Sequence, residues 1–271
     1  MIRLFYNSSM PRSGSELLQV ILHQNPEIYA SATSPLLEYQ FAARGNLTLP
    51  EVQSQNPELM SIAFLTMCRS MAESYYRPIT DRPYVIDKNR GWSHYWEWVD
   101  QWNPNPKMIC MVRDLRAVIA SMERIYRKSR HLPAGPDNPV QIQQMTVAER
   151  ANYWLHTQPI GLALKRTADL FQRGLAEKIL FVRYEDLCDY PQETLGNVYR
   201  YLGLKEYQHD FQNIKKEVEE NDVLYGPYGS HKVAPFLSKA KRNWGEVLPQ
   251  PVSNNIVSAA PWFFQTFNYE V

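Results

Sequence analysis

The chain has 271 residues, of which 44% are hydrophobic and 21% charged, and its formal net charge is +1. This composition is typical of a folded globular protein with an ample core. The near-neutral charge excludes a global positive field of the kind that attracts nucleic acid or an anionic membrane. Any anion site must therefore be a local cluster of basic side chains.

Short apolar runs alternate with longer helical patterns, which predicts an α/β fold with a central parallel sheet flanked by helices. The predicted strands cover residues 2–6, 84–86, 108–112 and 178–182, and the predicted helices cover 15–24, 57–77, 92–102, 115–127, 147–173 and 191–202. A kink is expected at Pro159 in the long helix, and loops are expected at 132–140 and 225–244. No linker interrupts the pattern, so we expect residues 1–271 to form a single domain.

Three cysteines, Cys68, Cys110 and Cys188, have no metal-ligand spacing. An odd and sparse set of this kind is typical of reduced structural thiols in the cytoplasm. The sequence has no apolar run of membrane-spanning length and no signal peptide before the first strand. We therefore expect a cytoplasmic protein that has neither a membrane nor a nucleic acid as its partner.

The first segment with chemical promise is Pro-Arg-Ser-Gly-Ser at residues 11–15, between the first strand and its helix. A loop in this position directs backbone N–H groups and a helix N-terminus at one point, which suits a phosphate or sulfate. Gly14 permits close approach of the backbone, Arg12 adds a fork of donors, and Ser13 and Ser15 add hydroxyls. A serine-rich helix cap explains the same residues equally well. The second glycine and the lysine of a Walker loop are absent.

A second segment follows the strand at 108–112. Arg113 stands at the carboxyl end of this strand, where open α/β sheets place their ligands. Ser121 shares a helix face with Ala117, and these small residues leave room for a phosphate. The alternative is that Arg113 pairs with Asp114 and that Ser121 is a packing residue.

Taken together and in this order, Pro-Arg-Ser-Gly-Ser and the later Val-Arg-Asp-x-Arg-Ala-x-x-x-Ser resemble the two motifs with which sulfotransferases bind 3'-phosphoadenosine 5'-phosphosulfate (PAPS). The version here is most similar to that of tyrosylprotein sulfotransferases and of bacterial sulfotransferase-like proteins. The resemblance extends from residue 3 to about residue 250. It implies a single P-loop-like sulfotransferase domain that moves a sulfuryl group from PAPS to a hydroxyl-bearing acceptor and releases 3'-phosphoadenosine 5'-phosphate (PAP). The acceptor could be a small molecule, a glycan or a peptide, and no metal is required.

The resemblance also implies which residues bind the donor. The loop 11–15 and the adjoining Glu16 match the site of the 5'-phosphosulfate, and Arg113 and Ser121 match the site of the 3'-phosphate. Tyr184 resembles the tyrosine that lies against adenine in the family. The alternative is that Tyr184 is an ordinary aromatic residue at a strand end. Three basic residues further on would also suit the 3'-phosphate: Lys239, Lys241 and Arg242.

Three residues are implied to stabilise charge on the leaving phosphate. Lys88 matches the lysine that contacts the bridging oxygen of the donor, and Ser238 resembles a serine near the scissile bond. Arg12 and the loop N–H groups complete this set of donors. Without the resemblance, Lys88 would be read as a solvated strand end. Arg90 stands where cytosolic sulfotransferases carry a basic histidine, so the chain departs from that branch.

The general base is the missing part of the pattern. Tyrosylprotein sulfotransferases carry a glutamate shortly after the first helix, whereas the matching stretch here, residues 31–35, contains no carboxylate. Glu38 is the first substitute, followed by Asp87 and His94, although Glu38 also fits a solvated surface residue. Two other functions remain open: a catalytically inactive PAP- or PAPS-binding protein and a nucleotide kinase.

Overall fold

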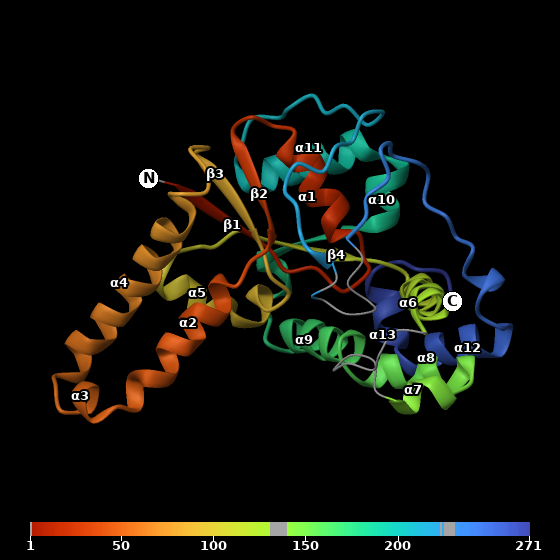
Figure 1. The fold of residues 1–271 in the computed structure, drawn as a ribbon, viewed down its shortest axis with the longest axis horizontal. Coiled ribbons are helices and arrows are strands. Elements are labelled where there is room, and N and C mark those ends of the chain that lie inside the picture. Colours follow the sequence, from red (N-terminus) through yellow and green to blue (C-terminus); the bar gives the residue numbers. More distant parts are fainter. Residues whose placement is uncertain (1, 131–139, 223, 225–230) are drawn as a thin grey trace.

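A computed structural model describes residues 2–130, 140–222, 224 and 231–271. Its centre is an all-parallel sheet of five strands in the order β2-β3-β1-β4-β5 (Figure 1). The strands are β1 (Arg3–Asn7), β2 (Ile28–Thr33), β3 (Tyr84–Lys88), β4 (Met108–Val112) and β5 (Ile179–Arg183). The predicted α/β class is therefore confirmed.

Helices cover both faces of the sheet because alternate residues of each strand point to opposite sides. In β4, Ile109 and Met111 join one hydrophobic core, whereas Met108, Cys110 and Val112 join the other. The first core packs under α1 (Ser15–His23), α10 (Tyr184–Asp189) and α11 (Pro191–Leu202). The second packs under α5 (Trp96–Trp102), α6 (Leu115–Ser129), α8 (Val147–His156), α9 (Ile160–Gln172), α12 (Gln250–Ala259) and α13 (Pro261–Thr266).

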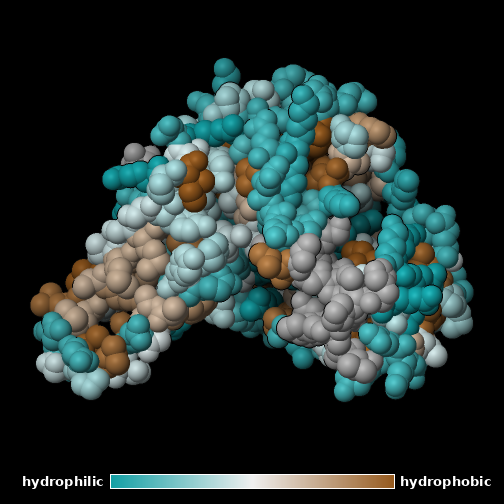
Figure 2. All heavy atoms as spheres, in the orientation of Figure 1, coloured by the Kyte–Doolittle hydropathy of each residue, from teal (hydrophilic) through white to brown (hydrophobic). Residues whose placement is uncertain are grey.

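Between β2 and β3 the chain forms an arm that extends away from the sheet (Figure 1). It consists of α2 (Leu36–Gly45), η1 (Asn46–Thr48), α3 (Pro50–Gln53) and α4 (Pro57–Tyr76). Apolar side chains gather on the outer part of this arm (Figure 2), and exposed ones include Leu49, Leu59, Ile62 and Met67. The shorter remaining elements are η2 (Trp92–Tyr95), α7 (Val140–Gln144), η3 (Ala176–Lys178) and η5 (Trp244–Glu246). None of the described helices has the length and apolar character needed to cross a membrane.

The predicted elements are largely confirmed, with identifiable exceptions. The predicted helix at 147–173 is wrong, because α8 ends at His156 and α9 begins at Ile160. Pro159 has no N–H to donate and disfavours helical geometry in the residue before it, which separates the two helices. The predicted helix at 92–102 begins as the 3-10 turn η2. The sequence did not predict β2, the helices of the arm before residue 57, the short helices α7 and α10 (Tyr184–Asp189), or the two C-terminal helices.

Both predicted loops fall partly outside the described residues, which omit 131–139, 223 and 225–230. Where the second loop is described, from residue 231 to 243, it contains neither helix nor strand. The three cysteines are buried and form no disulfide.

A buried ion pair fixes α6 against α8. The carboxylate of Glu123, which is 1% exposed, accepts hydrogen bonds of 2.8 Å from Nε and Nη2 of Arg150. Arg127, one turn further along α6 and 48% exposed, contacts the same carboxylate. Since Arg150 is also buried, removing the Glu123 charge would leave a cation inside the protein without its main partner.

We expect Glu123→Gln to lower the free energy of unfolding by about 3–5 kcal/mol, the usual cost of breaking a buried pair. Arg127→Gln is the matched control, and its loss should stay within about 0–1 kcal/mol because Arg127 is half exposed and its removal leaves Glu123 paired with Arg150. Urea denaturation of the three proteins measures both changes. Similar small losses in both variants would show that the Glu123–Arg150 pair does not stabilise the fold.

Candidate active site

The loop after β1 lies at the centre of the carboxyl edge of the sheet. Parallel pairing sets Asn7 beside Lys88 on one side and beside Ile109 on the other. The loop therefore emerges between the end of β3 and the end of β4, which Arg113 follows. Gly14 has φ 89° and precedes the first residue of α1, and Arg12 has φ 59°. The Ser13 hydroxyl donates to the carbonyl of Met10 at 2.6 Å, so it holds the loop together rather than facing a ligand.

Tyr184 packs directly against this loop. A Cβ atom added to Gly14 would lie 2.4 Å from Cδ2 of Tyr184, closer than two carbon atoms can approach. The Tyr184 ring also contacts Arg113, whose guanidinium lies 4.2 Å from the ring centroid. Burial raises the pKa of Tyr184 to about 12, so its phenol stays neutral. The glycine thus serves two needs: a left-handed backbone and space for an aromatic ring.

The two sequence motifs meet through Arg12. Its Nε donates to the hydroxyl of Ser121 at 3.3 Å, and its carbonyl accepts a 3.2 Å hydrogen bond from Arg113. Burial lowers the pKa of Arg12, and the positive charges of Arg113 and Arg90 lower it further, while Asp222 acts in the opposite direction. Three guanidinium groups at one sheet edge repel one another, and an anionic ligand relieves that repulsion.

A cavity of about 230 Å³, here called the donor cavity, opens over the loop and the start of α1. Predicted donor-binding residues and one predicted catalytic serine share its wall: Arg12, Gly14, Ser15, Glu16, Arg113, Tyr184 and Ser238. The rest of the wall comes mainly from residues 231–237. The N-terminus of α1 and the fixed guanidinium groups suit an anion in this cavity.

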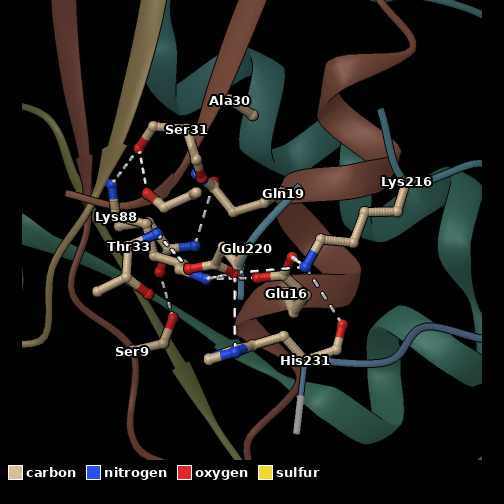
Figure 3. Close-up of polar contacts among 12 residues, drawn as sticks. Ser9, Glu16, Gln19, Ala30, Ser31, Thr33, Lys88, Lys216, Glu220 and His231 are labelled. Carbon is tan, nitrogen blue, oxygen red and sulfur yellow. Dashed lines mark hydrogen bonds and ion pairs between the residues drawn. The ribbon is translucent and has the colours of Figure 1, made fainter. Parts of the chain in front are cut away.

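Lys88 lies close to the donor cavity but is not part of its wall. Its buried ammonium is ion-paired with the carboxylates of Glu16 and Glu220, the latter at 3.4 Å (Figure 3). Lys216 joins the same network, 2.7 Å from Glu16 and 3.3 Å from Glu220. The predicted catalytic lysine is therefore held between two carboxylates, and one of them, Glu16, faces the donor cavity.

Glu220 is a site residue that the sequence analysis missed. Its carboxylate, 3% exposed, accepts a 2.7 Å hydrogen bond from the backbone N–H of Thr33 at the end of β2. Burial acts to raise its pKa, but the charge of Lys88, the Thr33 hydrogen bonds and the charge of His231 together lower that pKa to about 2. A carboxylate thus occupies the end of β2, close to where the sequence pattern lacks one. Glu220 lies in an irregular segment that is far from β2 in the sequence and carries no recognisable motif.

A second cavity of about 400 Å³, here called the acceptor cavity, adjoins the first. Aromatic and polar side chains line it, among them Phe41, Tyr95, Glu38, Asn89 and Arg166. The amide of Asn89 donates to both oxygens of Glu38, at 2.9 and 3.1 Å. The predicted base candidate Glu38 therefore faces a space large enough for an acceptor.

The other two base candidates line neither cavity. Asp87 is completely buried and accepts hydrogen bonds from the Tyr76 hydroxyl at 2.6 Å and the Trp92 indole at 2.7 Å. Nδ1 of His94 lies 3.3 Å from the carboxylate of Asp169. Of the basic residues proposed for the 3'-phosphate, Lys239 and Arg242 are both bound to Asp189.

A sulfotransferase family model matches residues 8–209. The chain also matches, over 99% of its length, a Caenorhabditis briggsae protein named "Putative protein-tyrosine sulfotransferase", with 24% identity and 89% of that protein covered. The chain belongs to the sulfotransferase family.

Solved sulfotransferase structures share the fold at low sequence identity. The sulfotransferase domain of the curacin biosynthetic pathway superposes with a TM-score of 0.59 at 17% identity, covering 100% of this chain and 98% of that one. The domain from the Synechococcus PCC 7002 olefin synthase gives 0.55 at 21% identity, covering 100% and 96%. Mouse sulfotransferase SULT7A1, complexed with PAP, gives 0.53 at 14% identity, covering 97% and 84%.

We expect Gly14→Ala to destabilise the protein more than Gly174→Ala does. Both glycines have positive φ, 89° and 67°, so both variants carry a backbone cost of about 1–2 kcal/mol. Only at position 14 does the new Cβ also collide with Tyr184, since nothing lies within 4 Å of the one at position 174. Denaturant unfolding measures the difference. Equal losses would show that Tyr184 moves aside freely and does not depend on the glycine.

Proposed function

We propose that this chain is a PAPS-dependent sulfotransferase that passes a sulfuryl group to a hydroxyl of an acceptor and releases PAP. The observation that supports this most is the gathering of Arg12, Arg90 and Arg113 around a cavity at the N-terminus of α1. A ligand with anionic groups at two positions suits such a cavity, and the adjoining second cavity offers space for an acceptor.

Within this proposal the donor-binding residues have distinct roles. The loop N–H groups, Ser15 and Arg12 would hold the 5'-phosphosulfate, and Arg113 and Ser121 would hold the 3'-phosphate. Tyr184 would lie against the adenine. The hydrogen bond from Arg12 to Ser121 supports this division, because it joins the two motifs, and Arg12 and Arg113 both line the donor cavity. The Ser13 side chain contributes to the shape of the loop through its bond to Met10.

Catalysis would rest on charge stabilisation at the leaving oxygen. PAPS supplies an activated sulfuryl group, and the protein's part is to align the acceptor and neutralise the charge that develops. Arg12 and Ser238 already face the donor cavity. Lys88 would reach the same point when a donor phosphate takes the place of Glu16 as its partner, leaving Glu16 paired with Lys216.

We also take residues 1–271 to be one catalytic domain. The C-terminal helices support this, because α12 packs against α6 and α8. The hydroxyl of Tyr269 donates to the buried carboxylate of Glu185 at 3.0 Å, and that carboxylate also accepts from the backbone of Asp114, the cap of α6. The C-terminus is thereby tied to the helix that carries Ser121.

Ligand-dependent melting tests the donor. We expect PAP at a hundred times its Kd to stabilise the protein by about 2.7 kcal/mol, which raises Tm by roughly 5 degrees or more. ATP with Mg²⁺ should give no comparable shift, because the loop lacks the Walker lysine. Differential scanning fluorimetry with each nucleotide measures this. A shift with ATP and none with PAP would favour a nucleotide kinase instead.

Turnover is tested by transfer of labelled sulfate from PAPS to a panel of phenols, alcohols, sugars and tyrosine peptides. We expect Lys88→Ala to lower kcat about 100- to 1,000-fold, the usual effect of losing one preorganised donor, while the PAP-dependent rise in Tm persists. Lys205→Ala is the matched control, because Lys205 is exposed and lines neither cavity. PAP binding without transfer to any acceptor would identify an inactive nucleotide-binding protein.

A further inference from the structure

Four residues line both the donor cavity and the acceptor cavity: Pro11, Arg12, Arg90 and His231. They mark the junction across which a group passing from one cavity to the other must travel. Proline has no titratable group, and arginine keeps its proton at any ordinary pH. Among the described residues of this junction, His231 is therefore the one whose side chain offers a nitrogen that can accept a proton.

His231 is oriented by a carboxylate. Its Nδ1 lies 2.9 Å from Oδ1 of Asp222, and its backbone N–H donates to Oδ2 of the same residue at 3.1 Å. Burial acts to raise the pKa of Asp222, but its hydrogen bonds and ion pair with His231 lower it overall. An ionised Asp222 favours the tautomer with the proton on Nδ1, so Nε2 carries the lone pair.

Other charged groups hold this imidazole at the junction. Oε2 of Glu220 lies 3.8 Å from Nδ1, and Lys216 donates to the His231 carbonyl at 3.4 Å (Figure 3). Glu220 is in turn bound to the end of β2 through Thr33. Two carboxylates therefore face the ring, and both stabilise the imidazolium that forms when Nε2 accepts a proton.

We propose that His231, oriented by Asp222, is the general base of the transfer reaction; this rests on the proposed function. Nε2 accepts the proton of the acceptor hydroxyl while the acceptor oxygen bonds to sulfur and the bond from sulfur to the phosphate oxygen breaks. The proton then passes to solvent, so the products are a sulfate ester, PAP and a proton. Glu38, the candidate from the sequence, is exposed, lines the acceptor cavity but not the donor cavity, and accepts hydrogen bonds from Asn89.

The test compares two acceptors of different acidity at saturating PAPS. In mildly alkaline buffer phenol is still protonated and must lose its proton during transfer, whereas para-nitrophenol is already largely ionised. We expect His231→Asn to lower kcat/KM for phenol about 100- to 10,000-fold, the usual contribution of a general base, and to affect para-nitrophenol much less. Asp222→Asn should show the same selectivity with a smaller loss. If the panel reveals only an alcohol as acceptor, that alcohol is compared with its more acidic fluorinated analogue, and His231→Asn should lower kcat/KM less for the fluorinated one because its proton is lost more easily.

Two controls separate catalysis from folding. His156→Asn removes an exposed histidine that lines neither cavity and should leave both rates unchanged. The PAP-dependent rise in Tm should persist in His231→Asn if the donor site is intact. Equal losses with both acceptors would indicate a structural role for His231 and overturn the proposal.

Selective loss in Glu38→Gln, with none in His231→Asn, would also overturn it and return the role of base to Glu38. A failure of this inference is distinguishable from a failure of the proposed function. If the inference fails, the unsubstituted protein transfers sulfate without needing His231. If the proposed function fails, the unsubstituted protein transfers sulfate to no acceptor.

Discussion

Repulsion among Arg12, Arg90 and Arg113 is the constraint on which the arrangement of the site depends. Three guanidinium groups gather at the carboxyl edge of a parallel sheet, where the start of α1 adds the partial positive charge of a helix N-terminus. Such a cluster is costly without an anion, and the rest of the site offsets that cost. Ser121 accepts a hydrogen bond from Arg12, and the Arg12 carbonyl and the Tyr184 ring both contact Arg113, so two of the three groups are held by the surrounding site.

A second set of charges connects the irregular C-terminal segment to the sheet. Lys88, Lys216, Glu16 and Glu220 form one network, and Glu220 also accepts a hydrogen bond from Thr33 at the end of β2. Lys216 and Glu220 belong to this network, and further along the chain residues 231–234 and 236–238 line the donor cavity. The same network explains why Lys88 is buried between carboxylates. Ligand binding and rearrangement of this network are therefore expected to be coupled.

Much of the site was predictable, because its residues follow strands in a parallel sheet. The carboxyl ends of β1, β3 and β4 must meet at one edge, so the loop at 11–15, Lys88 and Arg113 were expected to converge. Weak patterns were missed for physical reasons. β2 is an edge strand in which only Ile28 and Tyr29 are large, and the small and polar residues 30–33 leave little apolar periodicity to reveal it. The side chain of Ser13 was assigned to the ligand, whereas its burial turns it toward Met10.

By itself the sequence determined the fold class, the positions of most strands and helices, and the family, because these depend on periodicity and on motifs that are local in the chain. Only the tertiary structure decided which carboxylates and which histidine stand beside those motifs. Glu220 and His231 lie more than a hundred residues from Thr33, Lys88 and Arg12, in segments without helix or strand. Their place is set by ion pairs across the fold, and no pattern of neighbouring residues records a contact of that kind.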